Sequence, residues 1–134
     1  MALTKSEQKL LPGDHAPEFS LPAIDGKTYS INDFPDAKAV LVIFMCNHCP
    51  YVIPKVPVMN ELYNKFKDKG LVIIGINAND VKNYPEDSFE NMKTFAKEKG
   101  MQFIYTIDES QESAKAYGAT CTPDPFLFNK NHAL

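Results

Sequence analysis

Continuous runs of aliphatic and β-branched residues mark three segments of the chain, at 39–45, 71–78 and 125–129. Runs of this length without polar alternation are typical of strands that are covered on both faces. A shorter run at 103–108 predicts one more strand. We therefore expect a sheet that lies between two layers of other elements.

Apolar residues also recur at helical spacing, with polar residues between them. The segments that show this pattern and predict helices are 58–69, 87–100 and 109–118. Gly70 is well placed to end the first helix and Gly100 the second. Asp87 or Ser88 is suited to cap the start of the second helix. Because strands and helices alternate, the pattern predicts an α/β domain built on βαβ crossovers.

Before the first long apolar run, residues 13–34 alternate apolar and polar positions around Asp25-Gly26. An Asp-Gly pair between such runs favours a hairpin, because its residues tolerate a positive φ. We therefore expect an N-terminal β-hairpin beside the sheet. At 134 residues the chain is long enough for one domain, 1–134, and too short for two ordinary ones.

Composition narrows the classes of function. The formal net charge is −3, so no basic field indicates nucleic acid or an anionic membrane as a partner. No segment approaches the ~18 apolar residues that span a bilayer. The first residues lack the apolar core of a secretory signal, and three cysteines are an odd number for a disulfide framework. We therefore expect a cytoplasmic protein, in which a close cysteine pair is catalytic or binds metal.

The stretch "FMCNHCPY" at 44–51 carries the candidate chemistry. Cys46 comes at the carboxyl end of the first long apolar run, the edge at which parallel sheets place function. Cys49 comes where the next helix should begin, and Pro50 suits a first helical position. A helix N-terminus and a protonated His48 would both favour the thiolate form of Cys49. Asn47 is interpreted as a turn residue.

Two other interpretations of these cysteines stay open. Cys46 and Cys49 could be buried structural thiols, since cysteine often packs as a small apolar residue. Together with Cys121 and His48 they could instead supply four zinc ligands. However, the chain has no second paired motif at zinc-ribbon or zinc-finger spacing. We therefore expect neither a metal nor another cofactor.

Four segments, which cover nearly the whole chain in order, resemble a known family. They are "GDHAPEFSLPAIDGKTYSINDF", "LVIFMCNHCPY", "NDVKNYPEDSFENMKTFAKEKG" and "AKAYGATCTPDPFLF". The chain resembles the thioredoxin-fold superfamily, and within it the peroxiredoxin-like branch of the redoxin (alkyl hydroperoxide reductase/thiol-specific antioxidant) family. The pair "CNHCPY" and "CTPD" is the most specific part of this resemblance.

The resemblance implies a thioredoxin-like fold, with a central mixed sheet flanked by helices. It implies a cis proline at Pro123 that faces the thiols, with Thr122 and Pro123 shaping the cleft that holds a substrate. It also implies one more strand and a C-terminal helix after Leu134. If the chain ends there, a sheet edge and one face are uncovered, and we expect a partner or self-association to cover them.

The sequence departs from the family pattern at the cysteines. Cys49-Pro50 matches the peroxide-attacking cysteine and its proline, but Cys46 stands where that pattern has Thr or Ser, and Val42 where it has Pro. The arginine that binds peroxide in the family has no counterpart, because all fourteen basic residues are lysines. Relative to thioredoxins, Cys49 aligns with the first cysteine and Val52 with the second. The remaining groups suit disulfide exchange better than fast peroxide reduction.

The sequence and the resemblance therefore predict a thiol–disulfide oxidoreductase. Cys49 would attack a disulfide of a protein or small molecule, and Cys46 would resolve the intermediate into a Cys46–Cys49 disulfide. An external thiol would then reduce the enzyme, and Cys121 is an alternative resolving thiol. The alternatives are a weak thiol peroxidase with Cys49 as the peroxide-attacking residue, and a redox sensor or metal-binding protein without turnover.

Overall fold

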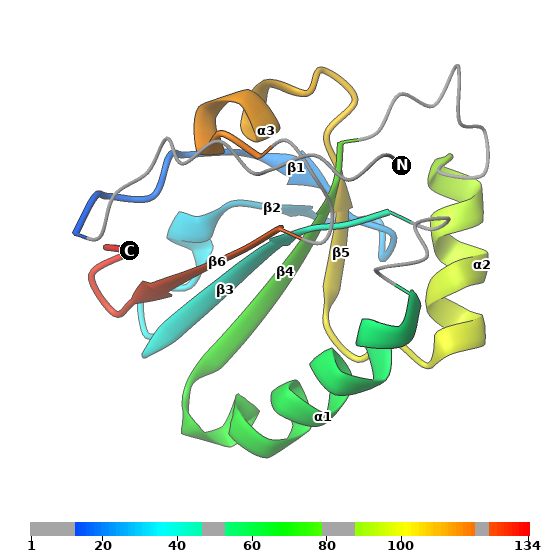
Figure 1. Ribbon diagram of the computed structural model, residues 1–134, viewed down its shortest axis with the longest axis horizontal. Coiled ribbons are helices and arrows are strands. Elements are labelled where there is room, and N and C mark those ends of the chain that lie inside the picture. The colour runs from blue at the N-terminus through cyan, green and yellow to red at the C-terminus, as the bar shows by residue number, and fades with distance from the viewer. Residues whose placement is uncertain (1–12, 47–52, 79–87, 120–123) are drawn as a thin grey trace.

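The structure is a computed structural model that describes residues 13–46, 53–78, 88–119 and 124–134. At its centre lies a four-stranded sheet with the strand order β5-β4-β3-β6 (Figure 1). The strands are β3 (Ala39–Phe44), β4 (Leu71–Asn77), β5 (Ile104–Ile107) and β6 (Asp124–Asn129). β3, β4 and β5 are parallel neighbours, whereas β6 runs antiparallel to β3. The predicted mixed sheet is confirmed.

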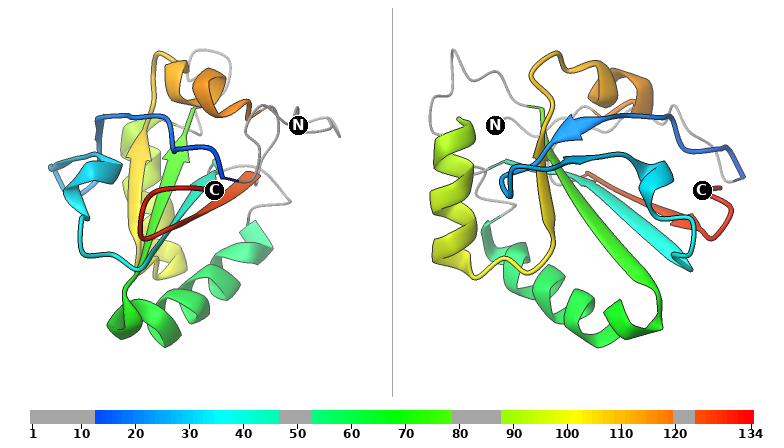
Figure 2. Two further views of the ribbon diagram at one scale, coloured as in Figure 1. Left: turned by 90° about the vertical axis from the view of Figure 1, so that its left-hand side faces the viewer. Right: turned by 180° about the vertical axis from the view of Figure 1, so that it is seen from behind.

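Helices and the N-terminal segment cover the two faces of the sheet (Figure 2). The helices are α1 (Val56–Phe66), α2 (Phe89–Lys99) and α3 (Glu112–Tyr117). One core cluster packs α1 and α2 against one face, through buried residues such as Met59 and Phe95. The other cluster packs α3 and the N-terminal segment against the opposite face, with Tyr117 and Phe44 at its centre. β3, β4 and β5 therefore contribute to a core on both of their sides, whereas β6 contributes to one. None of the described helices is long and apolar enough to cross a bilayer.

The predicted helix signals at α2 are confirmed. The Ser88 hydroxyl accepts a hydrogen bond from the backbone N–H of Asn91 and caps the start of the helix. Gly100 ends it in the left-handed conformation, and Gly70 does the same after α1 and the short 3-10 turn Lys67–Lys69. A further 3-10 turn, Ile53–Lys55, precedes α1, which begins at Val56.

The Asp-Gly hairpin is also confirmed. Its strands are β1 (Leu21–Pro22) and β2 (Thr28–Tyr29), followed by a 3-10 turn at Ile31–Asp33. Gly26 has a φ of 86°, which a turn of this kind requires. The Asp25 carboxylate accepts hydrogen bonds from the Lys27 N–H and the Tyr29 hydroxyl. The hydrogen bond to Asp25 raises the pKa of Tyr29 to about 12.

One strand differs from its prediction. The run 125–129 was expected to be covered on both faces, but β6 is the edge strand of the sheet and its burial alternates. Phe128 is fully buried, whereas the preceding side chain, Leu127, is 57% exposed. Pro125 is compatible with this position, because proline is tolerated in strands mainly at edges. The prediction was wrong because an apolar run does not show which strands become neighbours.

Candidate active site

The candidate site begins at Cys46, two residues after the end of β3. The backbone N–H of Met45 donates to the carbonyl of Ile76 at 2.9 Å, which extends the contact between β3 and β4 to their carboxyl ends. Cys46 is fully buried, in the core cluster that also contains Met45 and Val56. The sequence placed this cysteine at a strand end, and the structure shows it there. Its complete burial is a feature that the interpretation as a structural thiol includes and the redox interpretation does not specify.

The antiparallel strand β6 starts at the carboxyl edge of the sheet, where β3 ends. Asp124, its first residue, pairs with Phe44, and Asp124 is itself buried. Asp124 therefore begins β6 beside the end of β3, close to the point where the chain leaves β3 toward Cys46. The other predicted site residues lie outside the described residues; they are Asn47, His48, Cys49, Pro50, Cys121, Thr122 and Pro123. Their positions, including the cis proline, stay predictions.

Polar residues that the sequence analysis did not single out end the two neighbouring strands. Asn77 closes β4 and Asp108 follows β5, and both are almost completely buried. The backbone N–H of Asp108 donates to the carbonyl of Asn77 at 2.8 Å, which ties the two strand ends together. An asparagine or aspartate directly after an apolar run was the signal that could have indicated them.

Asp108 also fixes the start of α3. Its carboxylate accepts hydrogen bonds from the backbone N–H groups of Ser113 at 2.9 Å and Ala114 at 3.3 Å. The Ser110 hydroxyl donates to the same carboxylate at 2.9 Å. The Gln111 side chain donates to the carbonyl of Ala78 at 2.8 Å, so the loop before α3 is bonded to the end of β4 as well. These bonds hold the carboxyl edge of the sheet in a defined shape.

A glycine sets the packing directly beside Cys46. A Cβ atom at Gly75 of β4 would lie 2.8 Å from the Met45 sulfur and 3.2 Å from the Tyr105 ring. Cβ atoms do not approach other atoms this closely, so only glycine leaves room for Met45 here. Gly75 therefore helps to place the residue that immediately precedes Cys46.

Metal binding finds no support among the described residues. Within them, no three histidine, cysteine, aspartate or glutamate side chains gather as a group that could hold a metal ion. Three of the four ligands in the zinc interpretation, His48, Cys49 and Cys121, lie outside the described ranges.

Solved structures show the same fold. A hypothetical protein from Sinorhizobium meliloti matches with a TM-score of 0.90 and 36% identity, over 94% of this chain and 69% of that one. The thioredoxin domain of a thiol-disulfide oxidoreductase from Bacteroides vulgatus matches with a TM-score of 0.80 and 25% identity, over 93% of this chain and 86% of that one. The fold is therefore thioredoxin-like, as the resemblance implied.

Comparison with known sequences identifies the family of this chain. The thiol-disulfide oxidoreductase ResA of Bacillus thuringiensis subsp. konkukian is 33% identical over 125 residues, which are 93% of this chain and 68% of ResA. The model of the AhpC/TSA family matches residues 12–134. With this match over nearly its whole length and this relative, the chain belongs to the AhpC/TSA family.

Proposed function

We propose that the chain is a thiol–disulfide oxidoreductase in which Cys49 is the nucleophile and Cys46 is the resolving thiol. Family membership and the similarity to ResA, which is named as an enzyme of this type, support the reaction class. The place of Cys46 at the carboxyl edge of a thioredoxin-like sheet supports the choice of this cysteine pair.

The reaction takes place in two exchange steps. The Cys49 thiolate attacks one sulfur of a substrate disulfide, forms a mixed disulfide and releases the first substrate thiol. The Cys46 thiolate then attacks the Cys49 sulfur, releases the second substrate thiol and leaves a Cys46–Cys49 disulfide. Two electrons pass to the substrate in total. An external dithiol returns the enzyme to its reduced form by the same exchanges in reverse.

The complete burial of Cys46 is the observation that carries this assignment of roles. A disulfide in another molecule has no access to a thiol without exposed surface, so Cys46 is unsuited to be the first nucleophile. A cysteine three positions along the same chain can meet it from within the protein. The first attack is therefore assigned to Cys49 and the second, intramolecular attack to Cys46.

The neighbouring residues take supporting roles in this proposal. His48 favours the thiolate of Cys49, Asn47 and Pro50 shape the backbone around it, and Thr122 with Pro123 holds the substrate. The substrate class is a disulfide-bearing protein or small molecule. Peroxide is the poorer substrate, because the chain has no arginine to polarise the O–O bond.

The test compares the reduced wild-type protein with Cys46→Ser, Cys49→Ser and Cys121→Ser variants, each treated with glutathione disulfide. The wild type should release two glutathiones per protein and acquire a Cys46–Cys49 disulfide, as mapped by mass spectrometry. Cys46→Ser should stop after one glutathione, with the other held on Cys49. Cys49→Ser should not react, and Cys121→Ser should behave like the wild type.

Three results would contradict the proposal. Normal turnover by Cys46→Ser would remove the resolving role from Cys46. A Cys49–Cys121 disulfide in the wild type would move that role to Cys121. A faster reaction with hydrogen peroxide than with glutathione disulfide would make the protein a peroxidase.

A further inference from the structure

One buried histidine carries a ring nitrogen that makes no hydrogen bond within the described part of the chain. The side chain of His132 is 8% exposed, and its Nε2 atom has no hydrogen-bond partner among the described residues. Buried polar side-chain atoms in folded proteins nearly always have a partner, which is another protein group, an ordered water or an ion. The Nε2 atom of His132 is therefore a candidate ligand for a group from outside the chain.

A second histidine lies beside it. The ring centres of His15 and His132 are 6.2 Å apart, and the two rings are tilted by 60°. Because the bond from zinc to an imidazole nitrogen is about 2.0–2.1 Å long, two imidazoles that share a zinc ion have ring centres about 5–6.5 Å apart. The spacing of the His15–His132 pair therefore fits two ligands of one metal ion.

A backbone contact favours one nitrogen of His15 for metal binding. Its Nδ1 atom lies 3.2 Å from the carbonyl oxygen of Ala16. An imidazole whose Nδ1–H donates to a backbone carbonyl keeps the lone pair of Nε2 for a metal ion, and histidine ligands in proteins almost always have such a second contact. Because the side chain of His15 is exposed, water molecules can complete the coordination of an ion on this side of the pair.

The backbone holds the two histidines together, although they are far apart in the sequence. The N–H of Ala16 donates to the carbonyl of His132 at 2.8 Å, and His15 forms an antiparallel bridge with Ala133 (Figure 1). The N–H of His132 donates to the carbonyl of Asn129 at 2.9 Å, which fixes the turn after β6. A pair of ligands that is positioned in this way loses little conformational freedom when it binds an ion.

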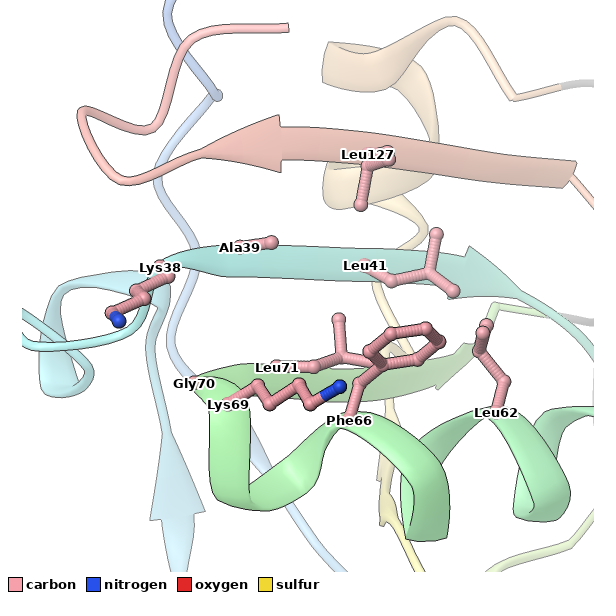
Figure 3. Close-up of a pocket in the computed structure, with 9 residues that line it drawn as sticks. All are labelled: Lys38, Ala39, Leu41, Leu62, Phe66, Lys69, Gly70, Leu71 and Leu127. Atoms are coloured by element: carbon pink, nitrogen blue, oxygen red, sulfur yellow. The ribbon is translucent and has the colours of Figure 1, made fainter.

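The pair lies at the other end of the sheet from Cys46. Asn129, the last residue of β6, pairs with Ala39 at the amino end of β3, and Figure 3 shows β6 ending beside the start of β3. Neither histidine lines the pocket of about 420 Å³ between α1 and β6 in the same view. The length of β3, about 16 Å, separates Ala39 from the edge that carries Cys46. An ion at the pair would therefore not contact the Cys46 thiol.

Two imidazoles make a site for a restricted class of ions. Structural and catalytic zinc sites use three or four protein ligands, and within the described residues no three side chains of the metal-binding types gather as a group. An ion at the pair would thus keep water ligands. Imidazole nitrogen suits zinc, copper and nickel, whereas magnesium and calcium prefer oxygen. The pair therefore selects a divalent transition-metal ion.

We propose that His15 and His132 bind one divalent transition-metal ion, such as zinc, through their Nε2 atoms. The ion gives the buried Nε2 of His132 a partner and joins the N-terminal segment at 13–16 to the turn after β6. It stabilises the folded chain, because only the folded form brings the two rings together.

The test titrates zinc chloride into a cysteine-free form of the full chain, Cys46→Ser/Cys49→Ser/Cys121→Ser, so that no thiolate can bind the ion. Isothermal titration calorimetry should show one zinc ion per chain, and zinc should raise the melting temperature. His15→Ala should weaken zinc binding by roughly tenfold or more, because a single imidazole remains. Magnesium chloride should not bind at the pair and should not raise the melting temperature.

The matched control is His48→Ala, which removes the third histidine of the chain and should leave zinc binding unchanged. His132→Gln keeps a polar side chain at the buried position and should weaken zinc binding as His15→Ala does. Circular dichroism checks that each variant is folded, and the exposed position of His15 keeps the test valid if His132→Gln does not fold. The proposal is overturned if zinc does not bind, if His15→Ala binds it as tightly as the parent chain, or if His48→Ala weakens binding equally.

Discussion

At the scale of single residues, Gly75 shows how the absence of a side chain positions another residue. The sulfur of Met45 occupies the space that a Cβ atom at Gly75 would need, and the Tyr105 ring would lie only 3.2 Å from that atom. We expect Gly75→Ala to lower the free energy of unfolding by about 1–3 kcal/mol, because an extra methyl group in a packed core forces its neighbours to move. Urea denaturation measures this loss.

A double-mutant cycle identifies the cause. In a Met45→Ala background the sulfur is absent, so Gly75→Ala should cost less than it does in the wild type. An equal cost in both backgrounds would show that the contact with Met45 is not responsible.

Single residues also show which features of the site the sequence could and could not predict. The position of Cys46 at a strand end followed from the apolar run before it, because strand ends are local features of the pattern. Its complete burial did not follow, since the core cluster that contains it also draws on Val56, Met92 and Tyr105, which belong to other elements. The cytoplasmic location and the roles of Cys49 and Cys121 stay predictions.

At the scale of elements, α3 depends on a residue outside its own span. Gln111, directly before the helix, makes no side-chain cap, and Asp108 supplies the acceptors for Ser113 and Ala114 instead. We expect Asp108→Ala to lower the free energy of unfolding by about 1–3 kcal/mol, because two N–H groups lose their acceptor. Asp108→Asn should cost less, since an amide oxygen can still accept.

Two measurements check this prediction. Thermal or urea denaturation gives the loss of stability, and amide hydrogen exchange at Ser113 and Ala114 should speed up in Asp108→Ala. The exposed neighbour Glu109 provides the control, because Glu109→Ala removes a carboxylate without removing a cap. Unchanged exchange at Ser113 and Ala114 would refute the capping role.

Elements differ in how well the sequence predicts them. The ends of α2 followed from Ser88 and Gly100, because capping depends on residues only a few positions apart. The position of β6 at the edge of the sheet did not follow from the sequence. Its run is as apolar as an inner strand, and its edge position follows from the strand order, in which β6 pairs with β3 alone among the described strands.

At the scale of the whole molecule, the carboxyl edge of the sheet joins segments that are far apart in the sequence. β3 pairs with β4 on one side and with β6 on the other, and the N–H of Asp108 donates to the carbonyl of Asn77 at the ends of β5 and β4.

The pairing of β3 with β6 also bears on the order in which the protein forms during synthesis. Cys46 is synthesised well before β6, the strand that pairs with β3 beside it. Closing so long a loop is slow and cannot precede translation of β6. A nascent chain therefore presents Cys46 before its surroundings are complete. We expect the growing polypeptide to be more open to adventitious oxidation than the finished protein.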